Sequence, residues 1–156
     1  MSYLVWTDNL NTGIDVIDTQ HRQIIVYINQ LHDAKLTHDR NEVGQVIGAL
    51  IDYTVSHFGF EEALMQDAGY EFVRAHKKVH ELFIKRIEEL QQRFIMGEDI
   101  QDELQALLTR WLLNHIKHDD ASYVTTVKPK VNIHTQQDAH VGWLSRTLSR
   151  FFRTPS

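Results

Sequence analysis

The feature that most constrains the fold is a hydrophobic pattern of helical spacing that runs through most of the sequence. Apolar residues recur three and four positions apart over long stretches, as they do on the buried face of an α-helix. Only Pro129 and Pro155 interrupt the chain, and no segment alternates apolar and polar residues as a half-buried strand does. The sequence therefore predicts an all-α protein.

The pattern separates into four segments joined by short connections. We expect helices over residues 18–36, 41–68, 70–96 and from 99 to shortly before 129. Helices joined by only a few residues pack antiparallel, because a short connection cannot carry the chain to the far end of the preceding helix. The predicted architecture is an antiparallel up-down-up-down four-helix bundle with an N-terminal arm and a C-terminal amphipathic extension.

Local signals mark several of the helix ends. Asp18 or Thr19 is expected to cap the first helix, and Asp39 together with Glu42 is expected to open the second. Gly69 stands where the second helix should stop, since glycine readily adopts the left-handed conformation that ends helices. The residues before the first helix are expected to form an ordered but irregular arm.

The chain is expected to hold one folded domain and an extension. With 156 residues, 42% of them hydrophobic, it can bury one core, and the predicted bundle covers residues 1–130. In the extension, residues 131–156, Leu148 and Phe151 belong to an apolar stripe and Arg150 to a basic one, which indicates a short amphipathic helix. Either this helix packs on the bundle, or residues 138–153 contact an anionic membrane or a partner protein.

Composition excludes several classes of function. The chain has 16 Lys+Arg against 21 Asp+Glu and a net charge of -5, the wrong sign for a protein that binds nucleic acid. It has no cysteine, so any metal must be bound by nitrogen and oxygen ligands. The chain start lacks a signal-peptide pattern, and there is no apolar run of roughly 18 residues. We therefore expect a soluble, cytoplasmic protein.

Histidine is the residue type whose placement most needs an explanation. Two pairs of metal-ligand types lie four positions apart, so that each pair shares one helix face. These pairs are His57 with Glu61, and His76 with His80. Such a pair alone is weak evidence, but both lie on the inward stripes of their helices, and His21 and His115 lie on the inward stripes of the other two. Six such groups in one core predict a metal pair between them, because an unpartnered buried polar group is costly.

At this point the residues resemble the hemerythrin family, over most of residues 1–129. The matching motifs are Asp18-Thr19-Gln20-His21, His57 with Glu61, His76 with His80, and Trp111-Leu112-Leu113-Asn114-His115 followed by Asp120. The resemblance implies two non-haem iron ions in a carboxylate-bridged Fe-O-Fe type centre. It implies that one iron is bound by His76, His80 and His115, the other by His21 and His57, and that Glu61 and Asp120 bridge them.

Helix geometry alone does not decide whether Asp119 or Asp120 is the second bridging carboxylate. Five positions separate His115 from Asp120, which is roughly 140° around an ideal α-helix, whereas Asp119 lies nearly above His115. The family spacing selects Asp120.

The resemblance further implies that molecular oxygen binds at the iron with fewer protein ligands. Imidazole and carboxylate ligands suit iron. Trp111 and Leu112 lie about one turn before His115 and are expected to line the oxygen pocket, although both are core residues under any interpretation.

The leading functional hypothesis is a non-enzymatic protein that carries, stores or delivers oxygen. An alternative is a redox or protective protein that acts on peroxide or nitric oxide at the same di-iron site. A third hypothesis is an oxygen or iron sensor that works through a partner. By analogy with single-domain bacterial members of the family, we expect a monomer.

Overall fold

The computed structural model describes residues 3–120, 123–129 and 146–152; the side chains of residues 118–120 lie outside the described part. The elements in chain order are η1 (Asp8–Leu10), α1 (Asp15–Thr37), α2 (Arg40–Asp67), α3 (Val73–Ile95), α4 (Gln101–Asn114) and η2 (His115–Asp120). Residues 123–129 and 146–151 are also helical. Every regular element in the described ranges is a helix, which confirms the predicted all-α class.

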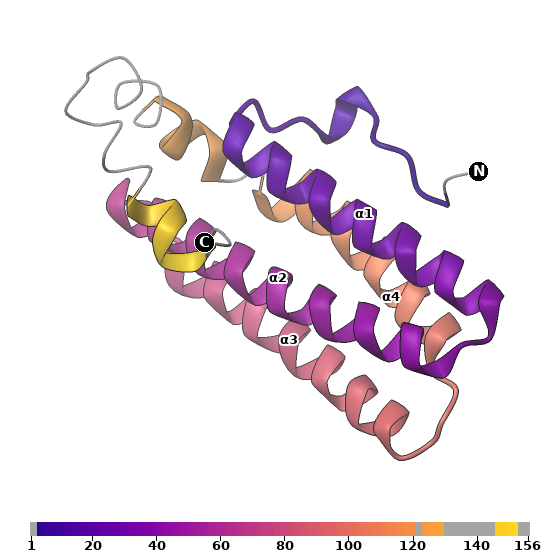
Figure 1. Ribbon diagram of the computed structural model, residues 1–156. Coiled ribbons are helices and arrows are strands. Elements are labelled where there is room, and N and C mark those ends of the chain that lie inside the picture. The colour runs from indigo at the N-terminus through magenta and orange to yellow at the C-terminus, as the bar shows by residue number, and fades with distance from the viewer. Residues whose placement is uncertain (1–2, 121–122, 130–145, 153–156) are drawn as a thin grey trace.

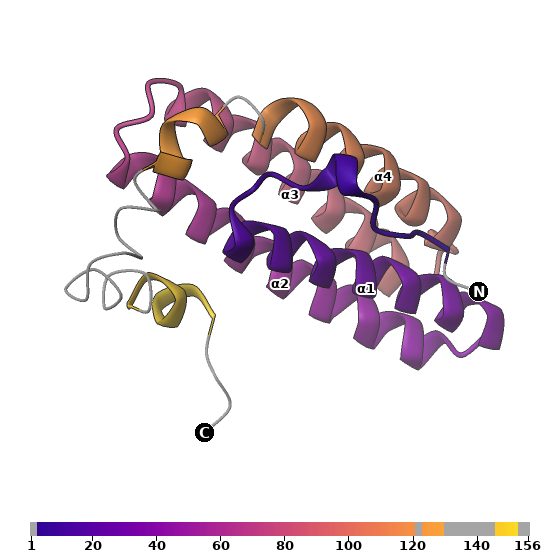
Figure 2. The same ribbon diagram turned by 90° about the horizontal axis from the view of Figure 1, so that it is seen from above.

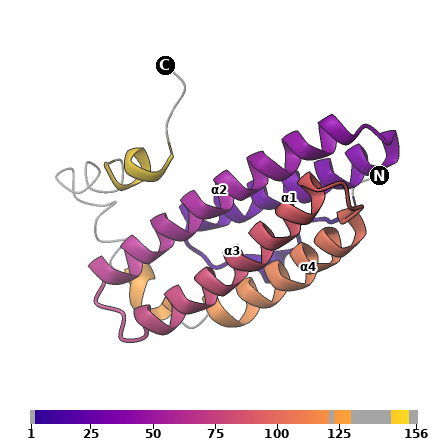
Figure 3. The same ribbon diagram turned by 90° about the horizontal axis from the view of Figure 1, so that it is seen from below.

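The four long helices run alternately up and down (Figure 1). Helix α1 packs against α2 and α4, and α2 packs against α3. Figure 3 shows α3 and α4 on the side of the bundle opposite α1 and α2. The N-terminal arm runs lengthwise over the side formed by α1 and α4 (Figure 2). It is held there by Asn29, whose side chain exchanges two hydrogen bonds with the backbone of Leu4.

The start of α1 differs from the prediction. The helix begins at Asp15, and its N-cap residue, Ile14, makes no side-chain cap, so neither Asp18 nor Thr19 is the cap. The Asp18 carboxylate lies inside the first helical turn and accepts hydrogen bonds from the backbone N–H groups of Thr12 and Gly13. It therefore ties the arm to the helix, in a position where a negative charge also favours the helix dipole.

The ends of α2 follow the predicted signals. The Asp39 side chain accepts hydrogen bonds from the backbone N–H groups of Asn41 and Glu42, as an N-cap does. At the other end Gly69 has a φ of 74°, and the N–H of Tyr70 donates to the carbonyl of Met65 at 2.9 Å. This bond belongs to the glycine-terminated helix ending that satisfies the last carbonyl groups.

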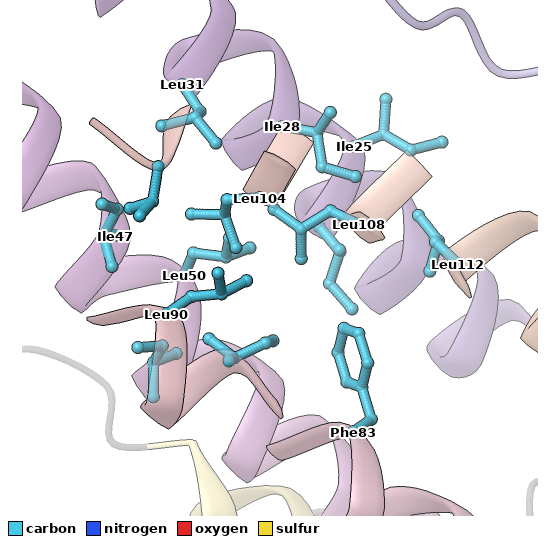
Figure 4. Close-up of a cluster of buried hydrophobic side chains, with 14 of the residues drawn as sticks. Ile25, Ile28, Leu31, Ile47, Leu50, Phe83, Leu90, Leu104, Leu108 and Leu112 are labelled. Atoms are coloured by element: carbon cyan, nitrogen blue, oxygen red, sulfur yellow. The ribbon is translucent and has the colours of Figure 1, made fainter. Parts of the chain in front are cut away.

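The core is divided into two apolar clusters. The larger fills the half of the bundle around Ile28, Leu50, Leu90 and Leu104 (Figure 4). The smaller lies toward the other end and includes Phe60. In every helix, the candidate ligands lie in the sequence between residues of the two clusters, as His21 does between Ile17 and Ile24. The bundle therefore places a polar layer between two apolar blocks.

The fourth predicted helix does not continue as a single α-helix to Pro129. It changes at His115 into η2, a π-helical turn that ends at Asp120. A π-helix contains one more residue per hydrogen-bonded turn than an α-helix and often marks a functional site. Sequence periodicity does not predict the change, because the same residue types form both kinds of turn.

The C-terminal extension is described for residues 146–152 only, and the rest of the expected amphipathic helix lies outside the described residues. The described part packs on the bundle: Leu148, Phe151 and Phe152 contact the smaller apolar cluster. None of the described helices is both long and apolar enough to cross a membrane.

Candidate metal centre

Five imidazoles and one carboxylate meet in the polar layer of the bundle. They come from α1, α2, α3 and the start of η2, and each is at most 5% exposed: His21, His57, Glu61, His76, His80 and His115. Their ligand atoms fall into two groups that share Glu61, with all atoms of each group within 4.8 Å of one another. The structure thus brings together six of the seven ligands expected from the sequence.

The first group surrounds Oε1 of Glu61. The Nε2 atoms of three histidines lie 2.9, 3.0 and 3.5 Å from this oxygen, in the order His76, His80, His115. The rings of the three pack edge to face, with centroids 4.6 to 5.3 Å apart. This is the set that the family resemblance assigns to one metal ion.

The second group surrounds the other oxygen of the same carboxylate. Nε2 of His57 lies 3.3 Å from Oε2 of Glu61, and Nε2 of His21 lies 4.0 Å from it. The two rings pack edge to face at a centroid distance of 4.8 Å. Glu61 therefore presents one oxygen to three imidazoles and the other to two, which is the geometry of a carboxylate placed to bridge two metal ions.

The protein environment keeps Glu61 ionised. Burial alone raises the pKa of this carboxyl group, but the charge of His57 and hydrogen bonds from His115, His57 and His76 outweigh burial and lower the pKa well below its ordinary value. An ionised carboxylate is the form that binds a metal ion.

The outer nitrogens of two histidines have hydrogen-bond partners. Nδ1 of His57 donates to Oε1 of Gln20 at 2.7 Å, and Nδ1 of His80 donates to Oε1 of Glu62 at 3.1 Å. With a metal ion bound, such an outer bond would keep the ring proton on Nδ1 and leave the Nε2 lone pair for the metal, and it orients the ring. The sequence analysis assigned no role to Gln20 or Glu62, although each is adjacent in sequence to a predicted ligand.

Tyr123 is a further residue that sequence reasoning missed. Its side chain is fully buried, and its hydroxyl donates a hydrogen bond to Oε2 of Glu61 at 3.0 Å. The ring also packs edge to face with His76 at a centroid distance of 5.4 Å. The only sequence signal for this role was its place on the segment that follows the predicted ligands of the fourth helix.

Aromatic rings cover the three-histidine group. Trp111 stacks on His115 with centroids 4.4 Å apart and on Phe83 at 3.6 Å, and Phe58 stacks on His80 at 3.8 Å. The direct ring contacts of Trp111 are therefore with the three-histidine side of the centre. Leu112 is 1% exposed and belongs to the larger apolar cluster. The role of both residues in an oxygen pocket stays a prediction.

The backbone of η2 bears on the seventh expected ligand. The Asp120 side chain lies outside the described part, but its backbone ends the π-helical turn that begins at His115. A π-helix joins residue i to residue i+5 by a hydrogen bond, so residues five apart lie much nearer to one face than the roughly 140° of an ideal α-helix. The preference for Asp119 was worked out for an ideal α-helix, and the π-helical turn reduces it without removing Asp119 as a candidate.

The donor set fits a pair of imidazole- and carboxylate-bound transition-metal ions. All six candidate ligands offer nitrogen or oxygen, the inward atoms converge, and two outer nitrogens are held by hydrogen bonds. Imidazole and carboxylate ligands suit iron, and six candidate ligands around one shared carboxylate exceed the four that a single structural zinc takes.

Comparisons with known proteins agree with this arrangement. Residues 12–127 match the sequence profile of the Hemerythrin HHE cation binding domain. The chain is 55% identical to the bacteriohemerythrin of Pseudomonas aeruginosa strain LESB58, over 97% of this chain and 99% of that protein. It is 37% identical to the bacteriohemerythrin of Methylococcus capsulatus, over 79% and 95%. A crystal structure of a wild-type hemerythrin superposes with a TM-score of 0.77 at 34% identity, covering 81% of this chain and 98% of that one.

Proposed function

The chain belongs to the hemerythrin family, and we propose that it binds molecular oxygen reversibly at a non-haem di-iron centre in the polar layer of its bundle. The observation that carries the proposal is the division of five imidazoles around one buried carboxylate, three at one oxygen of Glu61 and two at the other. The smaller number of protein ligands at the His21 and His57 side leaves space for a diatomic ligand there.

The proposed ligands of one iron are His76, His80 and His115, and those of the other are His21 and His57. Glu61 is the proposed bridge, and Asp120, which the family spacing selects, is the proposed second one; the π-helical turn of η2 is compatible with it. When bound, the iron pair supplies the two electrons that reversible oxygen binding needs. The imidazole-rich set carries less negative charge than a glutamate-rich one, which we infer slows irreversible oxidation to the ferric state.

The protein's own residues perform three tasks in this proposal. Gln20 and Glu62 hold the proposed ligands His57 and His80 with Nε2 directed inward. Tyr123 fixes the orientation of the Glu61 carboxylate through its hydrogen bond. The apolar clusters on both sides of the layer would exclude water from the centre, and a dry site suppresses side reactions that need water.

The test is a cycle of oxygenation. The protein is loaded with Fe(II) anaerobically, exposed to oxygen and then returned to anaerobic conditions while charge-transfer absorption is followed. We expect colour to appear, bleach and reappear over repeated cycles. A single irreversible oxidation would contradict reversible binding.

One observation favours a second candidate, a redox or protective protein acting on peroxide or nitric oxide. The buried hydroxyl of Tyr123 is an acid/base group next to the centre, and such groups assist proton transfer. Turnover of peroxide by the iron-loaded protein, lost in Tyr123→Phe, would favour this candidate. Undiminished oxygen cycling in Tyr123→Phe without peroxide turnover in the parent protein favours oxygen carriage.

A further inference from the structure

The described part of the C-terminal extension packs against α2 directly beside the proposed centre. Residues 146–151 form one short helix, and the backbone N–H of Phe152 donates to the carbonyl of Leu148 at 2.7 Å. The two views in Figures 1 and 3 place this helix along the half of α2 that leads to α3. We call residues 146–152 the C-terminal cover.

The cover is seated on the bundle by two phenylalanines. The Phe151 ring lies over Gly59 so closely that a Cβ atom at Gly59 would be 2.6 Å from the ring. The Phe152 ring packs on Tyr53 and Phe60, with centroid distances of 5.2 and 6.0 Å. Gly59 lies in the middle of a long helix, where glycine is unfavourable, and its missing side chain is the space that Phe151 fills.

Phe151 lies between two depressions, each of which reaches an outer hydrogen bond of the centre. One, of about 570 Å³, is lined by Phe151, Phe58, Glu62 and His80. The other, of about 830 Å³, is lined by Phe151, Phe152, Tyr53 and Gln20. Glu62 and Gln20 are the residues that hold His80 and His57. The cover thus borders two hollows, each lined by a residue that holds a proposed ligand.

His80 itself lines the first depression, although little of its surface is exposed. Its ring is 2% exposed, while the Glu62 side chain that accepts its hydrogen bond is 22% exposed. On the other side, the ring is covered by the stacked ring of Phe58. The outer edge of His80 is therefore the point at which the centre lies nearest to a hollow in the surface bordered by the cover.

We propose that the C-terminal cover closes the route by which iron and water exchange with the centre, and that this route opens when Phe151 lifts from Gly59. The proposal rests on the function proposed above. The few contacts made by one short helix can open without unfolding the bundle, since elements with few buried contacts open locally. The cover lies beyond residues 12–127, the part that matches the domain profile, although the Pseudomonas relative aligns over 97% of the chain. In this proposal it adds a control of access to a centre whose candidate ligands all come from the bundle.

Two substitutions displace Phe151 in different ways, and the chain offers a matched control. Phe151→Ala removes the ring. Gly59→Ala keeps the ring but places a methyl group where the ring packs. It also raises the intrinsic helix propensity of α2. Gly48→Ala makes the same change in the same helix at a position with nothing within 4 Å of the added Cβ. If the contact of Phe151 with Gly59 keeps the route closed, Phe151→Ala and Gly59→Ala have the same effect on access to the centre, and Gly48→Ala behaves like the parent protein.

The first measurement is the rate at which the iron-loaded protein releases iron to a strong Fe(II) chelator under anaerobic conditions. We expect release to be at least about tenfold faster in Phe151→Ala and Gly59→Ala, because the open form is more populated, and unchanged in Gly48→Ala. Equal rates in all four proteins would overturn the proposal.

The second measurement is made without iron. It therefore tests the proposal about the C-terminal cover independently of the proposal that the protein binds oxygen at a di-iron centre. The metal-free protein is treated with diethyl pyrocarbonate, and modification of His80 is followed by peptide mass analysis. Faster modification of His80 in Phe151→Ala and Gly59→Ala than in Gly48→Ala supports the cover even if the parent protein binds no iron. The same rate in every variant refutes it.

Discussion

The hydroxyl of Tyr123 donates a hydrogen bond to Oε2 of Glu61 at 3.0 Å, and neither side chain has any exposed surface. The bond connects the helical segment after η2 to the middle of α2, over 62 positions of sequence. Because a carboxylate hydrogen-bonded at one oxygen cannot rotate without losing that bond, Tyr123 fixes which oxygen of Glu61 faces which group of histidines.

We predict that Tyr123→Phe lowers the free energy of unfolding of the metal-free protein by about 1–3 kcal/mol, because it removes one of the donors to a buried charged acceptor. The substitution keeps the ring, so the packing on His76 should be unchanged. Urea denaturation followed by circular dichroism measures the difference. Tyr3→Phe, at a ring that is 44% exposed, is the control and should be neutral.

The lowered pKa of Glu61 predicts a specific pH dependence of the metal-free protein. A carboxyl group with a lower pKa in the folded than in the unfolded state stabilises the fold above its unfolded pKa, about 4.3 for glutamate. That contribution is lost as the pH falls from there through the folded-state pKa. In Glu61→Gln the stability should fall less steeply below about pH 4 than in the parent protein. Parallel stability curves for the two proteins would show that Glu61 is not responsible.

The outer hydrogen bonds of the histidines predict an effect on metal affinity rather than on folding. Gln20→Leu removes the acceptor for Nδ1 of His57 and should weaken iron binding at one of the two sites by about 10–100-fold. Competition with a chelator of known affinity measures this change. Gln30→Leu, at an exposed position on the same helix, should bind both irons with the affinity of the parent protein.

Removal of iron should lower thermal stability. Metal binding to ligands assembled only in the folded state stabilises that state, by about 2.7 kcal/mol at a free metal concentration 100 times the Kd. For a chain of this length the corresponding fall in Tm on chelation is about 5–10 °C. Differential scanning calorimetry before and after chelation tests this. A Tm independent of chelator, or an equal shift in a variant with both His57→Ala and His80→Ala, would contradict it.

Much of the fold followed from periodicity, because four long amphipathic helices with short connections leave few alternatives. The caps at Asp39 and Gly69 were predictable from local chemistry, since each acts within its own helix end. The role of Asp18 could not be predicted in this way, because its hydrogen-bond partners lie in the irregular arm before the helix. The π-helical turn at His115 was also missed, because no local signal separates it from a continuing α-helix.

The candidate ligands could be predicted because i,i+4 spacing and the family motif both depend on sequence alone. The residues that orient these ligands could not be predicted from spacing or from the family motif. Gln20 reaches His57 across the interface of α1 and α2, and Glu62 reaches His80 across that of α2 and α3. Such contacts depend on how the helices pack against one another. The seat of Phe151 on Gly59 is a similar case, since the sequence left the position of the extension open.

The most direct test of the account is the iron content of the protein after anaerobic loading and removal of unbound metal, measured by elemental analysis. The account predicts two irons per chain in the parent protein and loss of iron when His57 and His80 are both replaced by alanine. Fewer than two irons in the parent protein, or two irons retained by the double variant, would contradict it.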